Sequence, residues 1–399
     1  MFCVNEHIKC AILTLLYKNY NYGGVLQAFA LNHFINKNGM DAVQILFDVD
    51  LPQKSSFSQL KNTMKKSPVK ALIILKRIIY SVLYIRFRMV YERIFAKRYV
   101  EATHQRITSF DAFCKTKIPH TEMVYSGKSI TECNVQYDAF ITGSDQVWNL
   151  DWYHPAYFLD FVDTNKIKIS YAASSAKSTL TDEQKAIFKK SLKDYNAVSV
   201  REENMVDMLK DLSPVLPQLV VDPVLLLDSD DWDTISSGRK CEEPYILCYF
   251  LGKNKASRRL VKAFAKKNGL KIACISMTND KVTRNLGDYD VSNASPEDFV
   301  SLIKNAEYVF TDSFHACVFS IIHRKDFFVF NRSRKGEMSS RITSLLDMFE
   351  MPERFCNTPD KESLSYIEDI GKVCYEKEFE RYIIARQESE NFLFQNLKE

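Results

Sequence analysis

Apolar runs of strand length alternate with helical patterns along the first half of the chain. Residues 8–16 form one such run, residues 25–38 repeat apolar side chains at helical spacing, and residues 42–47 are apolar again. This order predicts a strand, a helix and a second strand, which together make a βαβ unit. A helical pattern at 181–195 accompanies further apolar runs at 139–142, 168–172, 197–200 and 218–221.

The second half repeats this alternation after a break. Asp222-Pro223 and the acidic run 228–233 interrupt the pattern, and a new apolar run begins at Tyr245. The expected elements are strands at 245–250, 271–275, 308–311 and 327–330, with helices at 256–268, at 296–305 and after Phe314. Short apolar strands that alternate with helices are typical of parallel sheets covered on both faces.

Two such sheets predict an α/β protein with two Rossmann-like domains that face a central cleft. We expect an N-terminal domain at residues 1–238 and a C-terminal domain at residues 239–375. Residues 376–399 are expected to form a C-terminal helix that could pack back on the first domain. Ligands of open parallel sheets bind beyond the carboxyl ends of the strands, so the working cleft should lie between the two domains.

Composition narrows the possible functions only a little. The 399 residues are 46% hydrophobic and 26% charged, which fits two globular domains without bulk disorder. A net charge of +4 is too small to indicate a nucleic-acid partner. The ten cysteines show no two-residue spacing of a zinc or dithiol site, and we expect structural thiols. The apolar stretch at 11–16 is short and has no basic leader, so we expect a cytoplasmic protein.

One segment differs from the rest in charge. Within a helical insertion expected at about 55–115, residues 65–98 carry ten lysines and arginines against the single acid Glu92, interleaved with leucine and isoleucine. Such a basic amphipathic helix can lie on an anionic membrane surface, here the inner face of the cell membrane. The alternative is a helix packed on its own domain with its charges in water.

Polar residues follow the predicted strand at 139–142. The sequence there is Gly143, Ser144, Asp145 and Gln146, at a strand end where a ligand would pass. Asp145 could take a proton from a hydroxyl or hold that hydroxyl in line. A strand followed by Gly-Ser-Asp is also typical of a turn that caps a helix, and both interpretations stay open.

Three other predicted strand ends carry polar residues. Ser313 and His315 follow the strand at 308–311, where an imidazole at a helix start can transfer protons beside a bound anion. Arg201 follows the strand at 197–200 and suits a bidentate contact with carboxylate or phosphate. The first strand is followed by the loop residues Asn21, Tyr22 and Gly23. Caps, surface ion pairs and turns would explain each of these separately.

Four of these stretches, in this order, resemble one known family. "YNYGGVLQAFAL", "YDAFITGSDQVWN", "SVREEN" and "TDSFHACVFSIIHRKDFFVF" are similar to segments of the polysaccharide pyruvyl transferase family, over roughly residues 8–350. The resemblance implies a glycosyltransferase-B-like architecture. It also implies transfer of a pyruvyl group from phosphoenolpyruvate to a sugar of a cell-surface polysaccharide precursor, such as an exopolysaccharide or capsule unit, as a ketal.

The resemblance also implies roles for individual residues. The donor-site histidine of the family falls on His315 and its donor-site arginine on Arg201. Some members have Arg-Leu-His where this chain has Ser313-Phe314-His315, so one anion-binding cation is missing; another residue must supply it, or the donor differs. Arg332, Arg334 and Arg341 are candidates, with Arg341 the best placed at a helix start, and surface charges are an equally good interpretation of all three. We expect His315 to supply a proton or neutralise donor charge and Asp145 to handle the acceptor hydroxyl. The acceptor or cleft-lining set is Asn21, Tyr22, Gly23, Gly143, Ser144, Asp145 and Gln146.

Two other functions remain open at this point. A nucleotide-sugar-dependent glycosyltransferase could use the same two-domain fold, because fold alone does not fix function. A non-catalytic glycan-binding member is the second, favoured by the missing arginine at Ser313. The expected partners of the transferase are phosphoenolpyruvate as donor substrate and a sugar or lipid-linked glycan as acceptor, with no metal and no other cofactor.

Overall fold

The computed structural model describes residues 8–49, 97–276, 286–332, 339–357, 363–376 and 379–397. Residues 65–96 of the predicted basic segment lie outside the described residues. Its last two residues, 97 and 98, begin helix α4 (Lys97–Lys117). No helix within the described ranges is long and apolar enough to cross a membrane.

The first half of the chain builds a five-stranded sheet in which every pairing is parallel. Its spatial order is β3 (His120–Tyr125), β2 (Asp41–Phe47), β1 (Lys9–Leu13), β4 (Ala139–Thr142) and β5 (Ile167–Ser170). A small parallel pair, β6 (Ser199–Val200) and β7 (Gln218–Leu219), continues from the β5 edge through isolated bridges. The helices of this half are α1 (Tyr22–Lys37), α4, α5 (Asp182–Ser191), α6 (Glu203–Leu209) and the short α7 (Ser229–Asp233).

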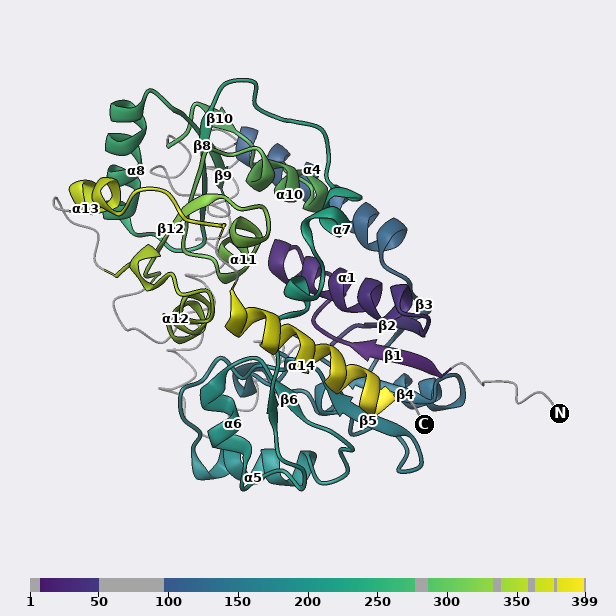
Figure 1. The fold of residues 1–399 in the computed structure, drawn as a ribbon. Helices are drawn as coiled ribbons and strands as arrows, with labels where there is room; N and C mark the ends of the chain where they lie inside the picture. Colours follow the sequence, from purple (N-terminus) through teal and green to yellow (C-terminus); the bar gives the residue numbers. More distant parts are fainter. Residues whose placement is uncertain are drawn as a thin grey trace, which may run out of the picture.

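The second half builds a six-stranded parallel sheet. Its spatial order is β10 (Tyr289–Asp290), β9 (Lys271–Ser276), β8 (Tyr245–Phe250), β11 (Tyr308–Thr311), β12 (Asp326–Phe330) and β13 (Phe355–Cys356). The accompanying helices are α8 (Lys255–Asn268), α10 (Pro296–Lys304), α11 (Phe314–Ile322), α12 (Ser339–Met348) and α13 (Ser363–Ile370). Figure 1 shows this half above the first.

Both sheets have the same topology when each is counted from its own first strand. The order is third, second, first, fourth and fifth in both, so the chain reverses direction across the sheet between β1 and β4 and again between β8 and β11. In open parallel sheets, ligands bind outside the carboxyl ends of the strands at this switch point. The prediction of an α/β protein with two Rossmann-like halves is confirmed.

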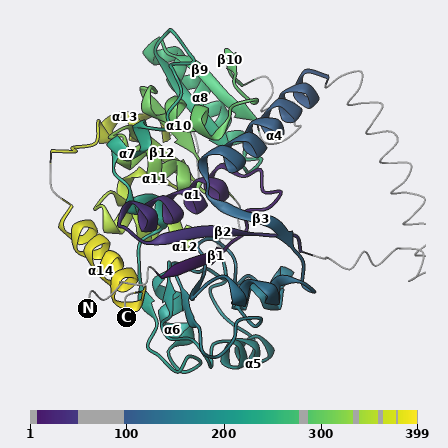
Figure 2. The same cartoon turned by 90° about the vertical axis from the view of Figure 1, so that its right-hand side faces the viewer.

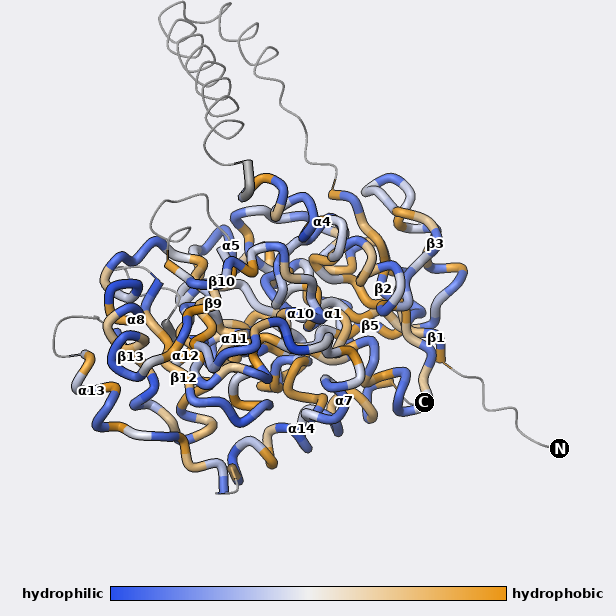
Figure 3. Tube along the Cα trace, turned by 90° about the horizontal axis from the view of Figure 1, so that it is seen from above, coloured by the Kyte–Doolittle hydropathy of each residue, from blue (hydrophilic) through white to orange (hydrophobic). Residues whose placement is uncertain are grey.

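Local sequence signals explain where several helices begin and end. Asn21 caps α1 by accepting from the amide of Gly24, and Thr181 forms a capping box with Gln184 at the start of α5. Helix α8 ends at Gly269, whose φ of 65° is the left-handed conformation that glycine adopts without strain. In Figure 3, orange apolar tracts concentrate along the inner strands and blue marks much of the outer surface.

Aromatic packing joins the two halves. Tyr22, at the start of α1, stacks on Phe299 of α10 with ring centroids 4.5 Å apart. The hydroxyl of Tyr22 donates to the carbonyl of Ala294 at 2.7 Å. Arg106 of α4, also buried, donates to the carbonyls of Ser276 and Ser292 in the second half. One continuous core cluster therefore contains residues from both sheets.

The C-terminal helix α14 (Glu380–Leu397) lies against the first half of the chain, as Figures 1 and 2 show. The hydroxyl of Tyr382 donates to the carbonyl of Leu225 at 2.8 Å, and Ser389 Oγ accepts from the amide of Val221 at 2.9 Å. Residues 221–226 thereby lie between α14 and α1. This helix fixes the chain segment that leads out of β7.

Replacement of Tyr22 by phenylalanine should weaken the junction between the halves. The variant keeps the ring stack but leaves the buried carbonyl of Ala294 without its partner, which costs about 1–3 kcal/mol of unfolding free energy. Urea unfolding would measure the loss. Tyr366→Phe is the matched control, because the exposed hydroxyl of Tyr366 can be replaced by water. Equal effects in the two variants would contradict a special role of Tyr22.

Candidate functional site

A small cavity of about 90 Å³ lies at the carboxyl ends of the central strands of both sheets. The first half contributes residues that follow β1 and β4, and the second half contributes residues that follow β8, β11 and β12. The lining consists of Asn21, Asp145, Gln146, Leu251, Asp312, Ser313, Phe314, His315, Arg332, Arg341 and Ile342. Both topological switch points thus open onto one cavity.

The loop after β4 is fixed by buried contacts. Gly143 has φ of 116°, and a Cβ there would overlap the carbonyl oxygen of Tyr171. The hydroxyl of Ser144 donates to the carbonyl of Ala172 at 3.0 Å, and its amide donates to Gln27 Oε1 at 3.1 Å. Gly143 and Ser144 therefore position the loop from within, and Asp145 and Gln146 are the members that reach the cavity.

Two more residues of the predicted acceptor set lie behind the lining. Tyr22 is fully buried in the junction between the halves. Gly23 lies against the imidazole of His315, and a Cβ at this position would overlap Nδ1 of that ring. The described lining of the cavity includes neither residue, whereas Asn21 does reach the cavity. Tyr22 and Gly23 therefore support the site from behind the cavity lining.

Helix α11 begins at the cavity. Its N-cap residue, Ser313, makes no side-chain capping bond, and its own amide donates to Thr311 Oγ1 at 3.0 Å. The first amides of α11 are therefore not satisfied by a cap, beside a lining that contains Ser313 and His315. Uncapped amides at a helix start favour an anion.

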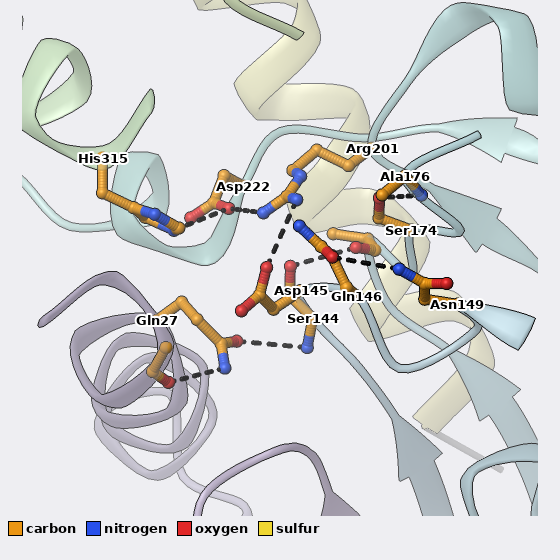
Figure 4. A network of polar contacts seen from close by, with 12 residues as sticks. Gln27, Ser144, Asp145, Gln146, Asn149, Ser174, Ala176, Arg201, Asp222 and His315 are labelled. Carbon is orange, nitrogen blue, oxygen red and sulfur yellow. Dashed lines mark hydrogen bonds and ion pairs between the residues drawn. The ribbon is translucent and has the colours of Figure 1, made fainter. Parts of the chain in front are cut away.

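His315 belongs to a row of charged side chains that crosses between the halves (Figure 4). Its Nε2 lies 3.5 Å from Asp222 Oδ2, and the same oxygen accepts from Arg201 Nη1 at 2.6 Å. Arg201 Nη2 in turn lies 3.5 Å from Asp145 Oδ1. His315 is carried by α11 in the second half, whereas Asp222, Arg201 and Asp145 follow strands of the first half.

Burial and neighbouring charges have opposite effects on the pKa values of Asp222 and Arg201. Burial favours the neutral form of Asp222, but the charges of His315 and Arg201 outweigh it and hold the pKa of Asp222 well below its usual range. Burial likewise disfavours the Arg201 cation, but Glu202, Asp222 and Asp145 raise its pKa above the usual value. Three carboxylates surround Arg201, whose side chain is only 3% exposed. Direct binding of a donor by Arg201 stays a prediction.

Arg341 has different surroundings. This side chain, at the start of α12, lines the cavity and forms no ion pair with any described residue. Burial lowers the pKa of Arg341, and the nearby cation Arg201 lowers it further. A buried cation whose pKa is lowered in this way is stabilised when an anion binds beside it. The replacement cation expected from the sequence therefore lies at the cavity.

Asp312 and Arg332 form the other side of the site. The carboxylate of Asp312 accepts from the amides of Leu251 and Gly252, both at 2.7 Å, and this holds the β8–α8 loop against the end of β11. Burial raises the pKa of Asp312, partly offset by Arg332. Arg332 Nη2 donates to the carbonyl of Asp312 at 3.0 Å. Neither Asp312 nor Asp222 was a predicted site residue, although each directly follows a predicted strand.

A family comparison agrees with the motifs in these loops. The model of the family described as polysaccharide pyruvyl transferase matches residues 21–334, which contain the lining residues other than Arg341 and Ile342. The chain belongs to the polysaccharide pyruvyl transferase family. Membership supports a transferase activity. A comparison with curated proteins gives no match.

Comparison with solved structures indicates the type of fold. The UDP-GlcNAc 2-epimerase of Methanocaldococcus jannaschii superposes with a TM-score of 0.52 at 10% identity, over 97% of this chain and 100% of that one. A UDP-N-acetylglucosamine 2-epimerase described as putative, from Listeria monocytogenes, gives 0.46 at 10% identity over 96% of both chains. Arabidopsis thaliana UGT89C1 gives 0.47 at 8% identity, over 98% and 97%. The fold is of the glycosyltransferase-B type, as predicted from the resemblance.

Replacement of Gly23 by alanine should disturb His315. A methyl group there overlaps the imidazole, so the variant should lose about 1–3 kcal/mol of unfolding free energy although alanine is otherwise favoured in helices. Gly238→Ala is the control, since a Cβ at Gly238 meets nothing within 4 Å. Chemical denaturation of both variants measures the difference. A Gly23→Ala protein as stable as the control would show that His315 is not held against α1.

The low pKa of Asp222 predicts a pH-dependent loss in Asp222→Asn. A carboxylate with a depressed folded pKa stabilises the protein above its unfolded pKa of about 3.9 and loses that contribution as the pH falls through the folded value. Breaking this buried pair should cost about 3–5 kcal/mol at pH 7, and the deficit should shrink below about pH 4. Urea unfolding across this range tests it, with the exposed Asp211→Asn as control. A deficit that does not change with pH would refute the ion pair.

Proposed function

We propose that this protein transfers a pyruvyl group from phosphoenolpyruvate to a sugar of a cell-surface polysaccharide precursor, forming a ketal and releasing phosphate. One observation carries this proposal beyond family membership. A small cavity brings together Arg341, which has no ion-pair partner among the described residues, the uncapped start of α11 and the imidazole of His315. A donor with two anionic groups and a carbon that must be protonated needs such a set.

The size of the cavity favours a small donor. Pockets for drug-sized ligands typically measure about 300–1,000 Å³, and this cavity measures about 90 Å³. Phosphoenolpyruvate has a three-carbon skeleton, whereas a nucleotide sugar such as a UDP-hexose carries a base, a ribose, a diphosphate and a hexose. Arg341 and the amides of α11 bind the carboxylate and phosphate of the donor, and Arg332 adds positive charge on the opposite side.

His315 and Asp145 divide the proton transfers. His315 lines the cavity and delivers a proton to the methylene carbon of the donor, while its contact with Asp222 orients the imidazole. The neighbouring carbon becomes electrophilic, and a first sugar hydroxyl adds to it while Asp145 takes the hydroxyl proton. A second hydroxyl then replaces the phosphate, which leaves with the bonding electron pair and the proton from Asp145. The proton of the second hydroxyl returns to His315, and both side chains regain their starting states.

Arg201 acts through its neighbours in this scheme. Its guanidinium contacts Asp145 on one side and Asp222 on the other, so it orients the base directly and the acid through Asp222. Such a residue is a positioning residue, because removing it would misalign two reacting groups without removing either. The proposed reaction consumes no cofactor and takes place in the cytoplasm. A lipid-linked acceptor at the inner membrane face would give residues 65–98 a role.

Thermal unfolding with phosphoenolpyruvate tests the donor. A ligand at about a hundred times its dissociation constant adds about 2.7 kcal/mol to the native state, so the midpoint should rise for the wild type. Arg341→Ala should abolish the rise, because the cavity loses a buried cation that the proposal assigns to the donor. Arg259→Ala, an exposed arginine of α8, should respond like the wild type. Stabilisation by a nucleotide sugar and none by phosphoenolpyruvate would instead make the protein a glycosyltransferase.

A further inference from the structure

A second and larger cavity, of about 320 Å³, adjoins the small one. The two cavities share the side chains of Phe314 and Arg341, which therefore form a common wall. The larger cavity is also lined by the start of α6, the segment from β7 to Leu225, helix α12 and the start of α14. Parts of the chain that are far apart in sequence thus enclose it.

The larger cavity is lined by both apolar and charged side chains. The apolar members include Leu219, Leu345 and Met348, here called the floor, and Leu219 is 38% exposed although it is a large apolar residue. The exposed charged members Glu203, Asp347 and Arg381 are here called the rim, and the buried Arg201 and Asp222 also line the cavity. A pyranose ring matches this pattern, because it combines an apolar face of C–H groups with hydroxyls at its edge.

The proposed reaction requires room for a second substrate. The small cavity suits a three-carbon donor and leaves no space for a hexose beside it. We propose that the larger cavity binds the acceptor, with an apolar sugar face on its floor and hydroxyls at Glu203, Asp347 and Arg381; this inference rests on the proposed function. The volume lies within the range of pockets that hold small organic ligands.

The two cavities adjoin at Phe314 and Arg341, so a sugar in the larger cavity would lie next to a donor in the smaller one. The ring of Phe314 is held by the guanidinium of Arg201, whose carbon lies 5.0 Å from the ring centroid. The same ring meets His315 edge-on at 5.2 Å. Arg341 stands beside it at the start of α12. In this proposal the reacting hydroxyls reach past Phe314 and Arg341 toward His315 and Asp145, which line the smaller cavity.

Ser344→Trp tests the assignment. Ser344 is exposed and lines only the larger cavity, so an indole there should fill the acceptor space and leave the donor cavity intact. The probes are phosphoenolpyruvate and a panel of p-nitrophenyl hexopyranosides. Phosphoenolpyruvate should raise the thermal midpoint of the variant as much as that of the wild type. The additional rise caused by a hexopyranoside should be lost, and its KM in a phosphate-release assay should increase at least about tenfold.

Two further variants separate the possible outcomes. Glu388→Trp places an indole at an exposed position of α14 outside the cavity and should behave like the wild type. Asp347→Ala removes a rim carboxylate without filling space and should raise the hexopyranoside KM by a smaller factor. A Ser344→Trp protein with wild-type KM would overturn the inference, as would a panel without any binding sugar. Absence of stabilisation by phosphoenolpyruvate in the wild type would instead overturn the proposed function.

Discussion

The buried guanidinium of Arg201 is the constraint on which the rest of the site depends. A buried charge without partners is strongly destabilising, and here three carboxylates from different loops supply the compensation. Asp145 follows β4, Glu202 follows β6 and Asp222 follows β7, so the ion pairs fix the ends of three strands relative to one another. The loops of the first half are therefore arranged before any ligand is present.

The second half joins this arrangement through His315. Its contact with Asp222 crosses between the halves, and the bare backbone of Gly23 lets the imidazole approach α1 closely enough to make that contact. Tyr22, the neighbour of Gly23 in sequence, packs into the junction between the halves at the same time. The loop after β1 thus links the stability of the domain junction to the position of the proposed acid. A change in how the halves pack should alter the geometry around His315 first.

Strand positions could be predicted from the sequence wherever strands are buried on both faces. The runs at 139–142, 245–250 and 308–311 coincide with β4, β8 and β11, because every residue of β4 and β8 and nearly every one of β11 is buried. The strand β3 was missed, since His120–Tyr125 is largely exposed and carries no apolar run. Helix α4 (Lys97–Lys117) was not predicted as a separate helix, because it falls largely within the helical insertion expected at about 55–115. Which of its side chains are buried depends on tertiary packing that the periodicity of the sequence does not reveal.

The sequence could predict which residues lie near one another, but not what each of them contacts. Asp145, His315 and Arg341 were expected near one cleft, and all three line one cavity. The sequence could not show that the amide and hydroxyl of Ser144 donate hydrogen bonds to Gln27 and Ala172, because these partners are distant in the chain. Asp222 looked like part of a domain boundary, since Asp-Pro is a typical turn signal. Only the fold reveals that its carboxylate joins Arg201 to His315.

The serine at position 313 has a structural consequence that extends beyond a lost charge. A long arginine side chain at the N-cap of α11 would occupy the lining of a cavity that measures only about 90 Å³. With serine there, Arg341 on α12 is the proposed source of positive charge, and it lines both cavities. In the proposed function this cation lies between the donor on one side and the space assigned to the acceptor on the other. Its position, rather than its mere presence, would then align the two substrates, because an anion bound to it would lie next to both cavities.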